Sequence, residues 1–125
     1  MTERGPPVLV IVDDDLAILR ALDSLARSLG CDVHTYDRGR AFLDDLESLD
    51  VDCALIDIHM PEMNGLELQR ILQSQAPHIR VIMMTALPAE GLRQRALTAG
   101  AYRLLEKPFD VESLKDCLAG LPGLG

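Results

Sequence analysis

The chain carries five short apolar runs separated by longer amphipathic stretches. Runs of this length predict buried β-strands, here at residues 8–12, 32–36, 53–56, 81–85 and 103–106. Between the first two runs, apolar residues recur at helical spacing from Ile18 to Leu29, with Asp15 suited to begin a helix and Gly30 to end it. Similar patterns predict helices over residues 40–49, 66–75, 89–99 and 111–121.

The strict alternation of strand and helix predicts an α/β fold of the (βα)5 type. Each helix must carry the chain back across the sheet in a right-handed crossover, so the strands are expected to be parallel, with helices on both faces. In the flavodoxin-like arrangement of this kind the strand order is 2-1-3-4-5, which makes strands one and three neighbours. A chain of 125 residues fits one such domain and leaves no room for a second core of ordinary size.

The last residues differ in composition from the rest of the chain. Residues 120–125 read GLPGLG, which is typical of a frayed tail or the start of a linker. We therefore expect one domain over residues 1–121 and a tail or linker start over residues 122–125. The pattern fits a freestanding domain and the front piece of a longer protein equally well.

The charge and the cysteines narrow the class of protein. A formal net charge of −8 argues against direct nucleic-acid binding, because a phosphate backbone would be repelled, and favours cations or a basic protein surface as partners. Cys53 and Cys117 lie in apolar segments and form no metal-type pair, which indicates buried thiols and a reducing compartment. No run is long enough to span a membrane and the first residues lack the apolar stretch of a signal peptide, so we expect a cytoplasmic protein that binds no membrane.

Polar side chains follow four of the predicted strands. Asp13 and Asp14 follow the first strand, Asp57 follows the third, Thr85 closes the fourth and Lys107 follows the fifth. Ligands of open parallel α/β sheets bind outside the carboxyl ends of the strands, near the point where strand order reverses. We therefore expect three carboxylates, a hydroxyl and an ammonium group to share one pocket.

Such a carboxylate cluster predicts a metal ion and a phosphoryl group. Like charges at close range raise pKa values and oppose folding, and a hard divalent cation, here Mg²⁺, relieves them. A carboxylate can attack phosphorus to give an aspartyl phosphate, and a lysine ammonium offsets charge on the transferring oxygens. Asp57 and Lys107 supply these groups, and the Thr85 hydroxyl could donate to a phosphoryl oxygen.

Four motifs resemble those of the receiver domains of bacterial two-component response regulators: VDDD at 12–15, LIDIHMPEMNGLEL at 55–68, MMTA at 83–86 and EKPF at 106–109. The resemblance covers essentially the whole chain. It implies that Asp57 is the phosphorylation site, that Asp14 and Asp57 bind Mg²⁺ directly, that Asp13 acts through water, and that the backbone carbonyl of His59 completes the protein ligands. It also implies a switch role for Thr85, a phosphate-binding role for Lys107 and a cis peptide bond between Lys107 and Pro108.

The resemblance implies a signalling domain rather than an enzyme in the usual sense. A sensor histidine kinase or phosphotransfer protein would donate the phosphoryl group, and the domain would catalyse its own phosphorylation and dephosphorylation on Asp57. An output domain or protein would read the switched surface, with a homodimer on activation as one option. Leu87 and His59, two residues past Thr85 and Asp57, would flank the path of an attacking water.

One position departs from the family pattern. Receivers usually carry Tyr or Phe three residues before the lysine, and its inward rotation reports phosphorylation, whereas this chain has Leu104. Tyr102 is two residues too early to replace it directly. The departure leaves the phosphoacceptor chemistry untouched but puts output through an aromatic switch in question.

Several of these residues can also be explained by a structural role without any chemistry. Asp15 is most simply a helix cap, and Asp57 alone would pass for a turn aspartate. Gly65 ends a turn that leads into a helix, where it would permit an unusual backbone angle. His59 is expected to be a loop side chain that shields the pocket, since no second His or Cys stands at ligand spacing.

Three other functions compete with the receiver. A phosphate-independent pseudo-receiver would keep the fold, but the complete set of site residues argues against it. A Mg²⁺-dependent phosphatase would need a second acid near the nucleophile and a cap over the substrate. Neither Ile58 nor His59 supplies the acid, and the connections are too short to supply the cap. A flavodoxin-like cofactor binder would need a phosphate loop after the first strand, where three aspartates stand instead.

Overall fold

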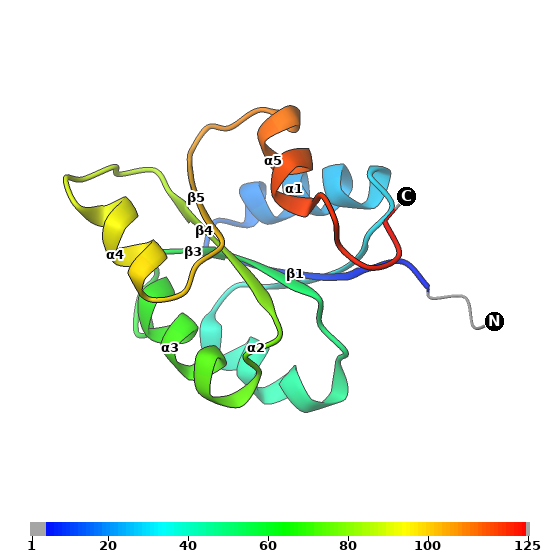
Figure 1. Cartoon of the computed structure of the whole chain (residues 1–125), viewed down its shortest axis with the longest axis horizontal. Helices are drawn as coiled ribbons and strands as arrows, with labels where there is room; N and C mark the ends of the chain where they lie inside the picture. Colours follow the sequence, from blue (N-terminus) through cyan, green and yellow to red (C-terminus); the bar gives the residue numbers. More distant parts are fainter. Residues whose placement is uncertain (1–4, 125) are drawn as a thin grey trace.

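A computed structural model describes residues 5–124, and Figure 1 shows its strands and helices alternating along the chain. The elements in order are β1 (Val8–Val12), α1 (Leu16–Ser28), β2 (Asp32–Tyr36), α2 (Gly39–Asp45), the 3₁₀ turn η1 (Leu46–Ser48), β3 (Cys53–Asp57), α3 (Gly65–Gln75), β4 (Arg80–Thr85), α4 (Leu92–Thr98), β5 (Arg103–Glu106) and α5 (Val111–Leu118). The predicted (βα)5 order is confirmed.

The strands form one parallel sheet in the order β2-β1-β3-β4-β5, as predicted. The register aligns the carboxyl ends of neighbouring strands: Val12 of β1 is paired with Ile56 of β3, and Asp57 with Met84 of β4. Thr85 is paired with Glu106 of β5. The polar residues that end or follow these strands are therefore delivered to the same edge of the sheet.

Alternation along the strands divides the core into two layers. Every second residue of β1, Val10 and Val12, packs toward α2, α3 and α4, whereas Leu9 and Ile11 pack toward α1 and α5. Figure 1 shows α1 and α5 on one side of the sheet and α2 and α3 on the other. The buried residues on both sides are mostly aliphatic, with the three free cysteines among those packed against α1 and α5.

Three helices are shorter than the periodicity predicts, and α2 ends at Asp45, where the 3₁₀ turn η1 follows. Helix α4 begins at Leu92 rather than near residue 89, because Gly91 adopts a left-handed conformation with φ 79° that a helix cannot include. Helix α5 ends at Leu118, and Gly120 follows with φ 82°. Apolar residues outside each helix keep the helical spacing, so the sequence pattern is longer than the helix.

The last residues that the structure describes, 121–124, lie outside the helices and strands and contact the rest of the domain. Leu121 is buried, and its carbonyl accepts a hydrogen bond from the Leu124 amide at 3.2 Å. Leu124 is half-buried against the layer formed by α1 and α5. Apolar burial therefore holds this glycine-rich segment against the domain. Over residues 5–124, none of the helices has the length and apolar character to cross a membrane.

Candidate functional site

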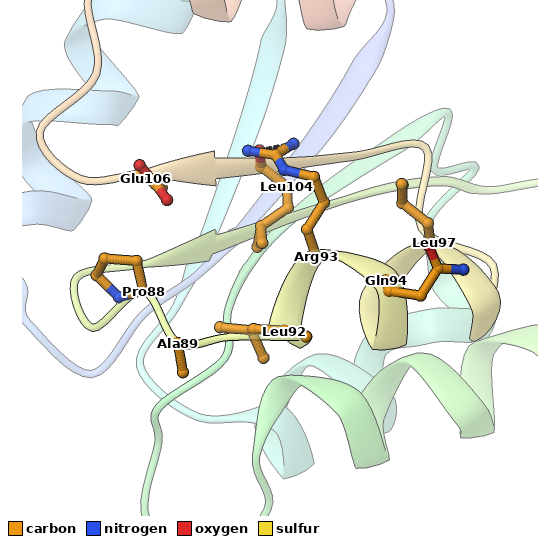
Figure 2. Close-up of a pocket in the computed structure, with 9 residues that line it drawn as sticks. Pro88, Ala89, Leu92, Arg93, Gln94, Leu97, Leu104 and Glu106 are labelled. Carbon is orange, nitrogen blue, oxygen red and sulfur yellow. Dashed lines mark hydrogen bonds between the residues drawn. The ribbon is translucent and has the colours of Figure 1, made fainter.

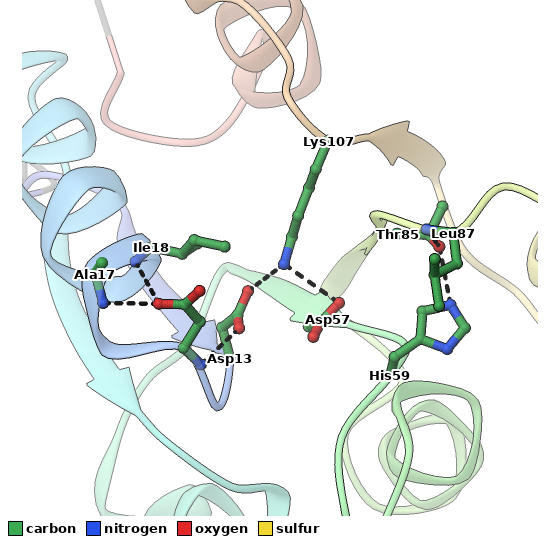
Figure 3. A network of polar contacts seen from close by, with 9 residues as sticks. Asp13, Ala17, Ile18, Asp57, His59, Thr85, Leu87 and Lys107 are labelled. Atoms are coloured by element: carbon green, nitrogen blue, oxygen red, sulfur yellow. Dashed lines mark hydrogen bonds and ion pairs between the residues drawn. The ribbon is translucent and has the colours of Figure 1, made fainter.

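The predicted site residues meet at the carboxyl edge of the sheet, where strand order reverses between β1 and β3. Asp57 is the last residue of β3 and Thr85 is the last residue of β4. Asp13 directly follows β1, and Lys107 directly follows β5. Figure 3 shows the Lys107 side chain reaching down between Asp13 and Asp57 from the end of β5.

The three carboxylates form one acidic cluster. Asp13, Asp14 and Asp57 each offer a carboxylate oxygen, and these oxygens all lie within 4.8 Å of one another. Asp13 and Asp57 are buried, whereas Asp14 is exposed. Asp13 is held by its own backbone amide, which donates to Tyr36 O at 3.1 Å, and by its Oδ1 atom, which accepts from the Asp15 amide at 2.9 Å.

Asp15 caps the following helix, as predicted. Its Oδ1 atom accepts hydrogen bonds from the amides of Ala17 at 2.9 Å and Ile18 at 3.3 Å. These are two of the unpaired donors in the first turn of α1. The third aspartate of the VDDD motif thus ends the loop after β1 and turns the chain away from the acidic cluster.

Lys107 binds both buried carboxylates. Its Nζ atom lies 2.6 Å from Asp13 Oδ2 and 3.4 Å from Asp57 Oδ1. The Lys107 amide donates to Thr85 O at 2.7 Å, and the Lys107–Pro108 peptide bond is cis, which confirms the geometry implied by the resemblance. The side chain is largely buried, so this ion-pair network is shielded from solvent and is stronger than a surface pair.

Burial and charge set the ionisation of this network. Burial raises the pKa of Asp57 above its ordinary value, the charge of Asp13 raises it further, and Lys107 offsets part of the increase. Burial alone would lower the pKa of Lys107, but its hydrogen bond to Asp13 and the charges of both carboxylates outweigh this and raise it. The cluster thus holds three carboxylates, of which Lys107 pairs with the two buried ones, so an additional hard cation would be bound favourably.

The Thr85 hydroxyl is fully buried and makes two hydrogen bonds, to His59 and Leu87. Its Oγ1 atom lies 2.9 Å from Nε2 of His59 and accepts a hydrogen bond from the Leu87 amide at 3.0 Å. Figure 3 shows the His59 ring beside Thr85, with Asp57 between this pair and Lys107. The sequence predicts that His59 lies near the pocket but does not predict this contact, which the side-by-side positions of β3 and β4 could have indicated.

The loop after β3 corrects one prediction. The left-handed residue of this loop is Glu62, with φ 67°, and not Gly65. Gly65 begins α3 and is needed for a steric reason, because a Cβ atom there would lie 2.6 Å from the carbonyl oxygen of Asp57. Asn64 and Glu67 form a capping box at 2.9 and 3.1 Å. The helix thereby fixes the loop next to the acidic cluster.

Leu104 packs in the core of β5 beside a surface hollow. It is 5% exposed and lines a cavity of about 380 Å³ together with residues of α4. Figure 2 shows its side chain pointing toward Leu92, with Arg93 above it; the Arg93 guanidinium donates to Leu104 O at 3.3 Å. Tyr102 is 44% exposed and stacks under the guanidinium of Arg80, 4.3 Å from the ring centroid, so it does not occupy the usual aromatic position.

Leu87 lines the mouth of the site. It is 65% exposed and shares a shallow pocket with Asp57, His59 and Lys107. Its amide is tied to the Thr85 hydroxyl, so its backbone is fixed while its side chain faces solvent. Its side chain has no hydrogen-bonding atom and cannot orient a water molecule.

Comparisons with known proteins match nearly the whole chain to one family. The family model of the response regulator receiver domain matches residues 9–119. The response regulator protein TmoT of Ectopseudomonas mendocina is 40% identical over 107 residues, covering 86% of this chain and 49% of TmoT. The transcriptional regulatory protein FixJ of Bradyrhizobium diazoefficiens is 34% identical over 114 residues, covering 91% of this chain and 55% of FixJ. The chain thus spans about half the length of these curated relatives.

Solved structures give the same result. The crystal structure of a response regulator receiver protein from Burkholderia phymatum is 38% identical and superimposes with a TM-score of 0.83, covering 95% of this chain and 97% of that one. The receiver-type topology is therefore shared over nearly the full length of both chains.

Proposed function

The chain belongs to the response regulator receiver domain family of two-component systems, and we propose that it accepts a phosphoryl group on Asp57. The observation that carries this proposal is the position of Asp57, which ends β3 beside Asp13 and 3.4 Å from the Lys107 ammonium. A carboxylate nucleophile, an acidic cation-binding cluster and a cationic side chain are the groups that phosphoryl transfer to a carboxylate requires.

In the proposed reaction, a carboxylate oxygen of Asp57 attacks the phosphorus of a phosphohistidine. The new P–O bond forms as the P–N bond breaks, and the imidazole leaves with the bonding electron pair and takes up a proton. Lys107 offsets charge on the phosphoryl oxygens, and the Thr85 hydroxyl donates to one of them. Hydrolysis reverses the modification when water attacks the phosphorus, releases inorganic phosphate and restores the carboxylate.

The residues present suit Mg²⁺. Asp13, Asp14 and Asp57 supply hard carboxylate oxygens, and the backbone carbonyl of His59 is the fourth proposed protein ligand, with Asp13 acting through water. When bound, Mg²⁺ would neutralise charge on the carboxylates and the phosphoryl oxygens. Without it, Lys107 is left to neutralise the two buried carboxylates by itself.

The partners follow from the two-component role. We propose that a sensor histidine kinase or phosphotransfer protein donates the phosphoryl group in the cytosol, and that an output domain or protein reads the phosphorylated state. The chain matches about half the length of two longer regulators, which supports an output domain outside the matched region. Because Leu104 is buried where an aromatic residue usually rotates, we propose that the face of α4, β5 and α5 is reshaped by aliphatic repacking.

Intact mass spectrometry after incubation with acetyl phosphate and Mg²⁺ tests the phosphoacceptor proposal. We expect one added phosphoryl group per chain, which is lost again over time after the donor is removed. A chain that stays unmodified under conditions that label a known receiver would instead be a phosphate-independent pseudo-receiver.

The lifetime of the phosphorylated state is expected to depend on Leu87. Its exposed apolar side chain at the mouth of the site should exclude water from the phosphorus. Replacing Leu87 with Glu or Gln, which can orient a water molecule, should speed dephosphorylation about tenfold, corresponding to roughly 1.4 kcal/mol of barrier. The measurement is the decay of phosphorylated protein in Mg²⁺ buffer after the donor is removed. Leu97→Gln, a change of an exposed leucine on α4, is the matched control, and unchanged or slower decay in both Leu87 variants would contradict the prediction.

A further inference from the structure

The Thr85 hydroxyl is already engaged in the structure. A hydroxyl group has one hydrogen to donate and two lone pairs to accept with. The Leu87 amide uses one lone pair at 3.0 Å, and Nε2 of His59 lies 2.9 Å from the same oxygen. Because the Leu87 amide can only donate, the hydroxyl hydrogen is free for the imidazole, and Nε2 accepts it when the ring proton of His59 is on Nδ1.

This arrangement conflicts with the role proposed for Thr85 after phosphorylation. A phosphoryl oxygen on Asp57 carries no hydrogen, so Thr85 must donate its single hydrogen to make that bond. The same hydrogen cannot serve His59 and the phosphoryl oxygen together at full strength. The contact with His59 therefore favours the unphosphorylated arrangement, and a ligand that needs Thr85 must overcome it.

We propose that His59 is a positioning residue that acts as a latch, accepting the Thr85 hydroxyl hydrogen in the resting domain and releasing it when a phosphoryl group arrives. The inference rests on the phosphoacceptor function proposed above and adds a specific competitor for its switch residue. The latch sets how readily the domain adopts its phosphorylated arrangement.

The placement of His59 suits this role. It stands in the loop that directly follows β3, two residues after Asp57, and its ring is exposed while Thr85 is buried. Within residues 5–124, Thr85 is the hydrogen-bond partner assigned to the ring. The ring can thus move into solvent without breaking other hydrogen bonds, while Thr85 stays tied to Leu87. Releasing the latch requires the loss of one hydrogen bond and no rearrangement of the core.

Beryllofluoride, a non-covalent phosphoryl mimic, gives a direct test when its affinity is measured by NMR titration in Mg²⁺ buffer. His59→Phe keeps a planar ring and removes both nitrogens. Since one hydrogen bond contributes about 1 kcal/mol, His59→Phe should tighten beryllofluoride binding about fivefold. In a Thr85→Val background, where the latch has no hydroxyl to hold, the same substitution should change the affinity by less than about twofold. His78→Phe, at an exposed histidine before β4, is the matched control and should leave the affinity unchanged.

A second readout needs no phosphoryl mimic. Three-bond couplings of the Thr85 methyl group report its side-chain rotamer, and we expect one rotamer in the wild type and averaging in His59→Phe. Unchanged or weaker beryllofluoride binding in His59→Phe, or equal tightening in the Thr85→Val background, would overturn the latch. If the wild type bound no beryllofluoride, the phosphoacceptor function would fail, and the methyl couplings would still decide whether His59 holds Thr85.

Discussion

Replacing Asp57 with asparagine should abolish phosphoryl uptake and, in metal-free buffer, raise the melting temperature. The amide keeps the volume of the side chain but is not a nucleophile, so no acyl phosphate forms. Stability should increase because burial and the charge of Asp13 disfavour ionised Asp57, as its raised pKa indicates. Loss of labelling would then accompany a more stable domain, which excludes unfolding as its cause.

The difference in stability between the wild type and Asp57→Asn should depend on pH. Because the pKa of Asp57 is raised in the folded state, its contribution to stability is fully present below its ordinary value of 3.8 and is lost as pH rises through the raised value. The asparagine variant does not titrate there, so its stability advantage should grow from acid to neutral pH. Asp44→Asn, which changes an exposed aspartate paired with Arg40, is the control and should label normally. Equal labelling of wild type and Asp57→Asn would reject Asp57 as the acceptor.

Removing Mg²⁺ should stop phosphoryl uptake and destabilise the unmodified domain. The cation would bind the folded acidic cluster and not the unfolded chain, so it stabilises by mass action. At a free Mg²⁺ concentration about ten times Kd, the expected gain of roughly 1.4 kcal/mol corresponds to about 4 °C in melting temperature. The measurement compares excess Mg²⁺ with chelator at matched ionic strength.

Asp14→Asn provides the control for the metal prediction. Asp14 is the exposed member of the cluster, so its amide should weaken the response to Mg²⁺ while leaving the core intact. Equal melting temperatures with and without Mg²⁺, or an unchanged response in Asp14→Asn, would count against a cation site at these carboxylates.

The fold could be predicted from the sequence because its three central strands, β1, β3 and β4, bury nearly every residue. Segments such as β3, in which all five residues are buried, read as continuous apolar runs, and their alternation with helices leaves few topologies. The polar residues after these runs then had to meet at one edge, which is why Asp13, Asp57, Thr85 and Lys107 could be grouped before their distances were known.

The remaining features depend on tertiary contacts that periodicity does not contain. The apolar pattern near Leu92 does not show that Gly91 is left-handed and delays α4. Gly65 could be assigned a turn role, but its close approach to the Asp57 carbonyl appears only in three dimensions. The contact of His59 with Thr85 joins residues 26 positions apart and depends on side-chain orientation in addition to strand order.

Chemical mapping of the modified residue shows whether Asp57 itself carries the phosphoryl group. Borohydride reduces an acyl phosphate to an alcohol, so reduction of the phosphorylated chain followed by peptide mass spectrometry should find homoserine at position 57 and unmodified aspartate at Asp13 and Asp14. Homoserine at another position, or a phosphoryl group that resists reduction on a serine, threonine or histidine, would contradict the assignment.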